Sequence, residues 1–182
     1  IDFLSAGRIE LLLSLPVRRE EIILGTFLGV VLMTGLGLIL ALGGLSGVLF
    51  IKTDYFSAGP LIATGMGLLA FMCVYAWVLF VSIVTQSVPL SQASGLGIYL
   101  LCNLSSNRES IMSVFAPGWK RTAVEYFFLP FPQVSELSAW ASQAAGGQWE
   151  WADCPVGLII GALAFTAAGL GLSLAAFLNK DY

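Results

Sequence analysis

The side chains that most often carry out enzyme chemistry are scarce in this sequence and stand far apart. Histidine is absent, which excludes a histidine general base and a histidine-bearing metal site. Cys73, Cys102 and Cys154 have no C-x-x-C spacing, and two of them fall in apolar runs, where cysteine usually serves as a small hydrophobe. No nucleophile elbow, zinc-protease motif, phosphate-binding loop or pair of catalytic carboxylates occurs. The residues therefore predict that this chain is not an enzyme and binds no metal or cofactor.

The distribution of charge predicts a membrane protein. Hydrophobic residues make up 58% of the chain and charged residues only 10%, whereas about a quarter of an average soluble domain is charged. Runs of 30, 53 and 26 residues carry no charge, at 22–51, 55–107 and 154–179. A spanning helix needs about 20 mostly apolar residues, and a barrel would show segments of alternating polarity, which residues 36–42 lack. We therefore expect an all-α integral membrane protein.

Four membrane-spanning helices account for these runs. The longest run must hold two helices, and the cluster Gln86–Gln92 is the best turn between them, because it combines polar residues with Pro89. The expected parts are a connector at 1–20, spans at about 22–51, 61–85 and 90–106 within 21–106, a loop at 107–153, and a last span with its tail at 154–182. Because the chain opens on Ile1 and a polar segment, we also expect it to be the later part of a longer protein.

The loop at 107–153 and the orientation of the spans can be predicted only in part. Within the loop, Leu129–Pro132 breaks any helix, and the residues after it favour a short helix with one apolar face: Val134, Leu137, Trp140 and Ala141. Carboxylates in this region fit a solvated face: Glu125, Glu136, Glu150 and Asp153. Lysine and arginine number four on each side of the membrane and do not decide the orientation, although Arg18–Arg19 beside the first span favours a cytoplasmic start.

The polar residues inside the expected spans are all uncharged. Ion-coupled transporters usually hold ionisable residues in the membrane, so their absence argues against a coupled transporter built from this segment alone. We expect their hydroxyl and amide groups to hydrogen-bond to the backbone of their own helix. These residues are Thr34, Thr64, Ser82, Thr85, Ser94 and Asn103. No basic run that could bind nucleic acid is present.

Pairs of glycines four residues apart recur in the spans: Gly25 and Gly29, Gly43 and Gly47, Gly157 and Gly161. On membrane helices such pairs let two backbones approach closely. They predict either ordinary helix packing within one subunit or an interface with a second subunit.

Residues 2–15 form the one strongly amphipathic stretch before the first span. Phe3, Leu4, Ile9, Leu12 and Leu13 share a helical face, and Pro16 ends the helix. This pattern predicts a helix lying at the membrane surface and joined by a proline break to a long span. Such a helix can transmit a push from a soluble partner to the membrane core, or it can serve only as an interfacial anchor.

This segment resembles the signature of ABC-2 permeases, a family of ABC-transporter membrane subunits. In that family a pattern like G-T-x-x-x-L-L-S-x-P-V-x-R-x-x-x-x-x-G-K joins the second and third spans. The positions that match are Gly7, Leu12, Leu13, Ser14, Pro16, Val17, Arg19 and Gly25. Arg8 stands where threonine is usual, and Thr26 where lysine is usual.

The resemblance implies a larger assembly. The chain would carry the third to sixth of six spans, and the region before its last span would fold into short re-entrant helices. Residues 3–15 would be the coupling helix, seated in a groove of a separate ATP-binding subunit. The residues expected to bind that partner are Arg8, Glu10, Leu12, Leu13, Ser14, Pro16, Arg18 and Arg19. ATP and Mg²⁺ would be bound only by the partner.

The working unit implied by the resemblance holds two permease subunits, expected as a homodimer, and two ATPases in a bacterial inner (plasma) membrane. It would export a substrate, or support an extracytoplasmic accessory protein, with ATP hydrolysed by the partner. The alternative is a membrane anchor or scaffold that holds a soluble complex and transports nothing.

Overall fold

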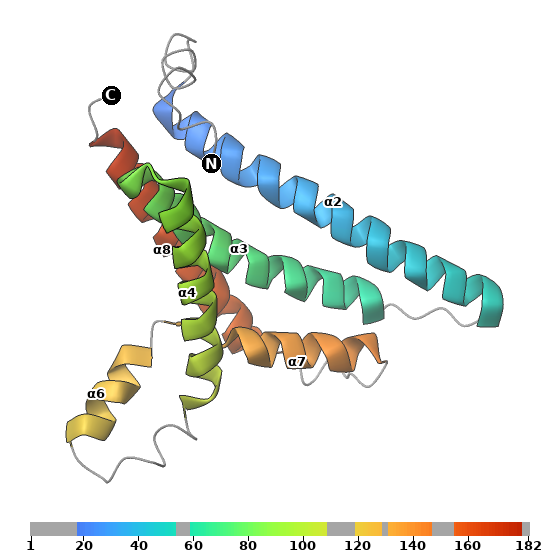
Figure 1. Cartoon of the computed structure of the whole chain (residues 1–182). Coiled ribbons are helices and arrows are strands. Elements are labelled where there is room, and N and C mark those ends of the chain that lie inside the picture. Colours follow the sequence, from blue (N-terminus) through green and yellow to red (C-terminus); the bar gives the residue numbers. More distant parts are fainter. Residues whose placement is uncertain (1–17, 54–58, 109–118, 129–130, 147–154, 180–182) are drawn as a thin grey trace.

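The computed structural model describes residues 18–53, 59–108, 119–128, 131–146 and 155–179 (Figure 1). Every regular element in these ranges is an α-helix, so the predicted all-α class is confirmed for the part described. The helices are α2 (Arg19–Thr53), α3 (Gly59–Thr85), α4 (Val88–Ser106), α6 (Trp119–Phe128), α7 (Val134–Ala145) and α8 (Val156–Leu178).

Three of these helices, α2, α3 and α8, are long and apolar enough to cross a membrane. This indicates a membrane protein and confirms three of the predicted spans by length and composition. Helix α4 has 19 residues, but its sequence is more polar and includes Gln92 and Asn103. It is not one of the three candidate spans. Its place as a fourth span stays a prediction.

The turn between α3 and α4 is tighter than the sequence predicts. Helix α3 ends at Thr85, Gln86 takes a positive φ of 51°, and α4 starts at Val88. The Gln86 backbone N–H donates to the Ser82 carbonyl at 2.9 Å, which closes the end of α3. Pro89 lies inside the first turn of α4, where a missing N–H costs no helical hydrogen bond, so the helix begins earlier than residue 90.

Helix α3 is the central element, in contact with α2, α4, α7 and α8. At its C-terminal end it forms one buried cluster with α2 and α8: Ile23, Phe27, Val31, Ala76, Leu79, Ile83 and Phe177. Nearer its middle it forms a second cluster with α4, α7 and α8: Cys73, Cys102, Val134, Leu137, Ala162 and Phe165. Two cores therefore lie one after the other along the same helix.

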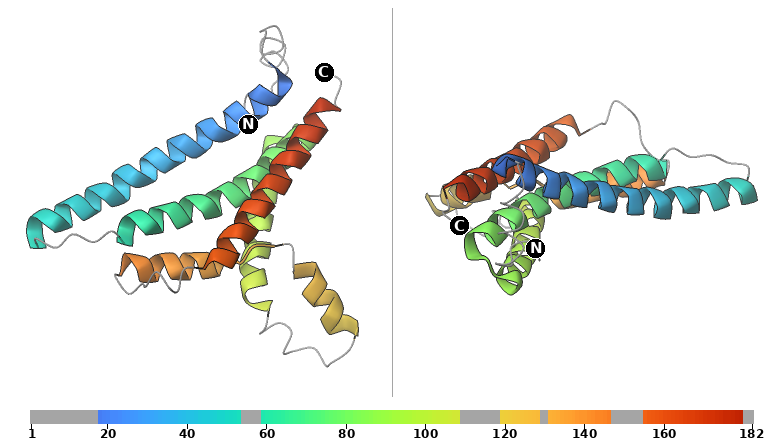
Figure 2. Two further views of the ribbon diagram at one scale, coloured as in Figure 1. Left: turned by 180° about the vertical axis from the view of Figure 1, so that it is seen from behind. Right: turned by 90° about the horizontal axis from the view of Figure 1, so that it is seen from above.

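The long helices alternate in direction: α2 and α4 run one way, and α3 and α8 run the other (Figures 1 and 2). The start of α2, the α3–α4 turn and the end of α8 lie toward one end, and the end of α2 and the starts of α3 and α8 lie toward the other (Figures 1 and 2).

The predicted short helix after Pro132 is confirmed as α7, with Val134 and Leu137 buried and Trp140 and Ala141 half-buried. Helix α6 was not predicted residue by residue.

Candidate functional site

The expected partner-binding residues Arg8, Glu10, Leu12, Leu13, Ser14 and Pro16 lie outside the described residues. Arg18 and Arg19 mark the start of α2, where the Arg18 backbone N–H donates to the Glu21 carboxylate at 3.3 Å. Glu20 and Glu21 occupy the first turn, where negative charge suits the helix dipole. The described part of the chain thus begins at a helix whose first turn is capped by Glu21.

Only the first half of α2 is held by other helices. Ile23, Phe27 and Val31 recur every four residues and are buried, with Phe27 stacked on Tyr75 of α3 at a ring distance of 5.8 Å. In the second half, large side chains such as Leu40 and Ile51 are exposed. The first half of α2 therefore packs against α3, with Phe177 of α8 in the same cluster.

The predicted glycine pairs make no close helix contact between described parts of this chain. A Cβ added at Gly25, Gly29, Gly43, Gly47, Gly157 or Gly161 would meet no atom within 4 Å. Their use as an interface with a second subunit stays a prediction.

Different glycines make the close approaches. A Cβ at Gly169 of α8 would lie 3.1 Å from the Trp77 ring and 3.2 Å from the Ala76 Cβ. A Cβ at Gly95 of α4 would lie 2.7 Å from a Val78 methyl, and one at Gly59 would overlap the Ala144 backbone of α7. Sequence reasoning missed these positions because none of them belongs to a spaced glycine pair.

Most polar side chains of the long helices bond their own backbone, as predicted. Thr64 donates to the Pro60 carbonyl, Thr85 to Val81 and Asn103 to Tyr99, each at 2.8–2.9 Å. Cys73 and Cys102 are free and buried, and the Cys73 thiol donates to the Ala162 carbonyl of α8 at 3.3 Å. Cys154 lies outside the described residues.

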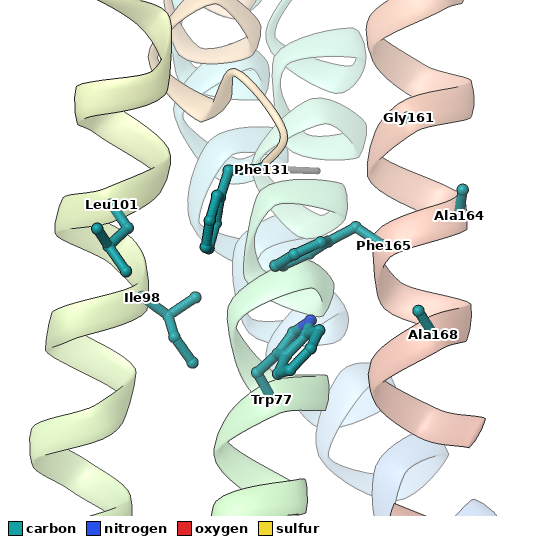
Figure 3. A pocket seen from close by; sticks show the side chains of 8 residues that line it. All are labelled: Trp77, Ile98, Leu101, Phe131, Gly161, Ala164, Phe165 and Ala168. Carbon is teal, nitrogen blue, oxygen red and sulfur yellow. The ribbon is translucent and has the colours of Figure 1, made fainter. Parts of the chain in front are cut away.

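An apolar pocket of about 640 Å³ lies between α3, α4 and α8. Figure 3 shows the aromatic rings of Trp77, Phe131 and Phe165 between the two outer helices. Trp77 stacks on Phe165 at 5.0 Å, and Phe131 contacts Phe165 at 5.9 Å. The remaining lining side chains are aliphatic or absent: Ile98, Leu101, Gly161, Ala164 and Ala168.

A smaller pocket of about 160 Å³ adjoins the apolar one and shares Phe131 and Gly161 with it. Its lining includes the Arg108 and Gln133 side chains and Gly157 in the first turn of α8. Together the two pockets place a cation and an amide beside an apolar chamber.

The Ser105 side chain, at the end of α4, hydrogen-bonds to the connector between α6 and α7. Its buried hydroxyl donates toward the Phe131 carbonyl at 3.0 Å and the Phe128 carbonyl at 3.3 Å. Phe131 is also the residue shared by both pockets, so Ser105 positions their common wall.

We expect Ser105→Ala to loosen this connector, because the Phe131 carbonyl loses its bond to the Ser105 hydroxyl and the Phe128 carbonyl keeps only the Phe131 N–H. The cost is about 1–2 kcal/mol of stability. Thermal unfolding of the purified protein in detergent measures it. Ser138→Ala is the matched control, since the Ser138 hydroxyl is exposed and bonds only the Val134 carbonyl of its own helix. An equal loss in the two variants would contradict the role of Ser105.

Comparison with known proteins gives no match: no family model, no curated protein and no solved structure is similar to this chain.

Proposed function

We propose that this chain is a membrane subunit of an ABC-2 type transporter, driven by ATP hydrolysis in a separate subunit. The observation that carries the proposal is the G-x-x-x-x-L-L-S-x-P-V-x-R segment, in which Gly7, Pro16 and Arg19 keep the family spacing. Its last residue, Arg19, is the first residue of α2, one of the three helices long and apolar enough to span a membrane. Such a subunit requires a surface segment directly before a span, and this order along the sequence supports the proposal.

The order of the helices supports the same proposal. Two short helices, α6 and α7, stand between α4 and the apolar helix α8. This is the position where the family folds short re-entrant helices before its last span. Helix α7 contacts both α3 and α4, so it belongs to the helix bundle.

In the proposed mechanism, closure of the ATPase subunits pushes the amphipathic segment. The push enters α2 at Arg18 and reaches α3 through Phe27 and its stacking partner Tyr75. Helix α3 transmits it to α8, because Ala76 and Leu79 share a cluster with Phe177. The residues of this chain carry out no chemistry in that cycle; they convert a movement at one membrane face into helix displacement.

Co-purification tests the proposal. The full-length protein should bind an ATPase that carries a phosphate-binding loop and an LSGGQ-like signature and is encoded beside it. Leu13→Glu and Arg19→Glu should reduce the recovered ATPase more than tenfold and abolish its coupled ATP turnover, because both place a repulsive charge in the docking segment.

Lys52→Glu is the control, a charge reversal of the same size at the far end of α2. If neither Leu13→Glu nor Arg19→Glu changes complex formation or ATP turnover, the coupling role is refuted. A complex that depends on these residues but in which the permease never alters ATP turnover would instead identify a scaffold.

A further inference from the structure

The apolar pocket lies midway along α8, one of the helices long and apolar enough to cross a membrane. Its α8 residues Ala164 and Ala168 stand well inside the helix, eight residues after Val156 and ten before Leu178. At 1.5 Å per residue they are about 12–15 Å from the two helix ends. The medium around such a pocket is hydrocarbon. Its lining offers a water molecule almost nothing to bond, and an empty pocket would lose dispersion contacts on all its walls.

The size of the pocket favours a slender occupant. A helix about 10 Å across would place only about 8 Å of its length, roughly five residues, in 640 Å³. An alkyl chain is much thinner and can follow α8 from Gly161 to Ala168 along the same space. This argues for an acyl chain rather than a helix of a second copy.

The adjoining small pocket supplies the charge that a lipid headgroup needs. Arg108 lies in its wall with Gln133, and no described aspartate or glutamate lines either pocket. The first turn of α8 is also there, and Pro155 at its N-cap provides no capping side chain. A guanidinium and uncapped backbone N–H groups favour an anionic oxygen, as in a phosphate.

We propose that the two pockets form one binding site for an anionic phospholipid of the surrounding membrane. One acyl chain fills the chamber between α4 and α8, and the phosphate is bound by Arg108 with help from Gln133. Phe131 and Gly161 line both pockets and therefore lie at the junction of chain and headgroup. The site requires only that the chain lies in a membrane, so it can fail or hold independently of the transporter proposal.

Trp77 provides the reporter, because its ring lines the acyl pocket. In the full chain the other four tryptophans, Trp119, Trp140, Trp149 and Trp151, are replaced by phenylalanine. Phosphatidylglycerol with a nitroxide in mid-chain is then titrated into the detergent-solubilised protein. We expect saturable quenching that unlabelled phosphatidylglycerol reverses about tenfold more effectively than phosphatidylcholine.

Paired variants separate the two halves of the site. Ala164→Phe fills the chamber and should abolish saturable quenching, while Ala167→Phe, on the same helix but outside the pocket lining, should not. Arg108→Gln should remove the preference for phosphatidylglycerol, Arg108→Lys should restore most of it, and Lys52→Gln should leave it unchanged.

Three outcomes would overturn the proposal. Quenching that rises without saturating would show partitioning into the micelle rather than a site. Equal quenching in the Ala164→Phe and Ala167→Phe variants would show that the lipid binds elsewhere. Efficient disulfide formation between two Ala164→Cys copies in membranes would assign the chamber to a second subunit.

Discussion

Gly169→Leu will separate α3 from α8 and cause the largest loss of stability of any glycine substitution in α8. The added Cβ would stand 3.1 Å from the Trp77 ring and 3.2 Å from the Ala76 Cβ, and the leucine methyls extend further into the same space. Trp77 cannot easily retreat, because Phe165 stacks on it and Phe80 contacts its edge at 6.0 Å. Overpacking of this kind costs about 3 kcal/mol, or about 6–12 °C in melting temperature.

Thermal unfolding of the detergent-solubilised protein, followed by size-exclusion chromatography, measures this loss. Gly171→Leu is the matched control, since the same change two residues along meets no atom within 4 Å. Both variants lose the same glycine flexibility and gain the same apolar volume. If they unfold within about 2 °C of each other, which corresponds to less than about 1 kcal/mol for a protein of this size, the close contact between α8 and Trp77 does not exist.

Phe27→Ala should release α2 from the rest of the bundle. Phe27 is 3% exposed, and it is the only α2 side chain shown to stack on an aromatic ring of α3 in the described part of the chain. Among the large side chains of α2, Ile23 and Val31 would remain buried. Within lipid the loss is mainly one of packing, since hydrocarbon fills the space less well than the ring does. We expect a cost of about 2–4 kcal/mol, or about 5–15 °C in melting temperature.

Leu28→Ala serves as the control, because Leu28 is adjacent to Phe27 but 53% exposed. Truncating it removes apolar volume from the lipid-facing side and should change the melting temperature little. In the proposed transporter, Phe27→Ala should also uncouple ATP turnover from the bundle while the ATPase stays bound. Bound ATPase with unaltered coupling would mean that the push does not pass through Phe27.

The long helices could be predicted because their determinant is local. A charge-free run such as 22–51 has to satisfy its backbone in lipid, and the helix satisfies it whatever the neighbours are. The observed α2 accordingly extends only slightly beyond the prediction on each side. Helix α7 could be predicted for a related reason, since Val134 and Leu137 define an apolar face within one short segment.

The contacts between helices could not be predicted, because they depend on which face of each helix turns inward. Gly169 and Gly171 stand in the same stretch of small residues, yet only Gly169 lies against another helix. Nor could the two pockets be predicted, because Arg108, Phe131 and Gly161 are brought together by three separate segments. In the sequence, Arg108 is only the first charged residue after a long apolar run, and nothing there indicates a binding site.

The unequal lengths of the spans have a consequence for the membrane around them. Helix α2 has 35 residues and α8 has 23, which gives about 52 Å and 35 Å at 1.5 Å per residue. Both must fit a hydrocarbon layer about 30 Å thick, so α2 has to tilt much further than α8.

The tilt mainly displaces the second half of α2, because only the first half packs against α3. Figures 1 and 2 show the far end of α2 extending beyond the start of α3. In a thicker bilayer α2 would stand more upright. The thickness of the lipid layer therefore sets the angle of α2 to the membrane, and with it the position of the far end of α2.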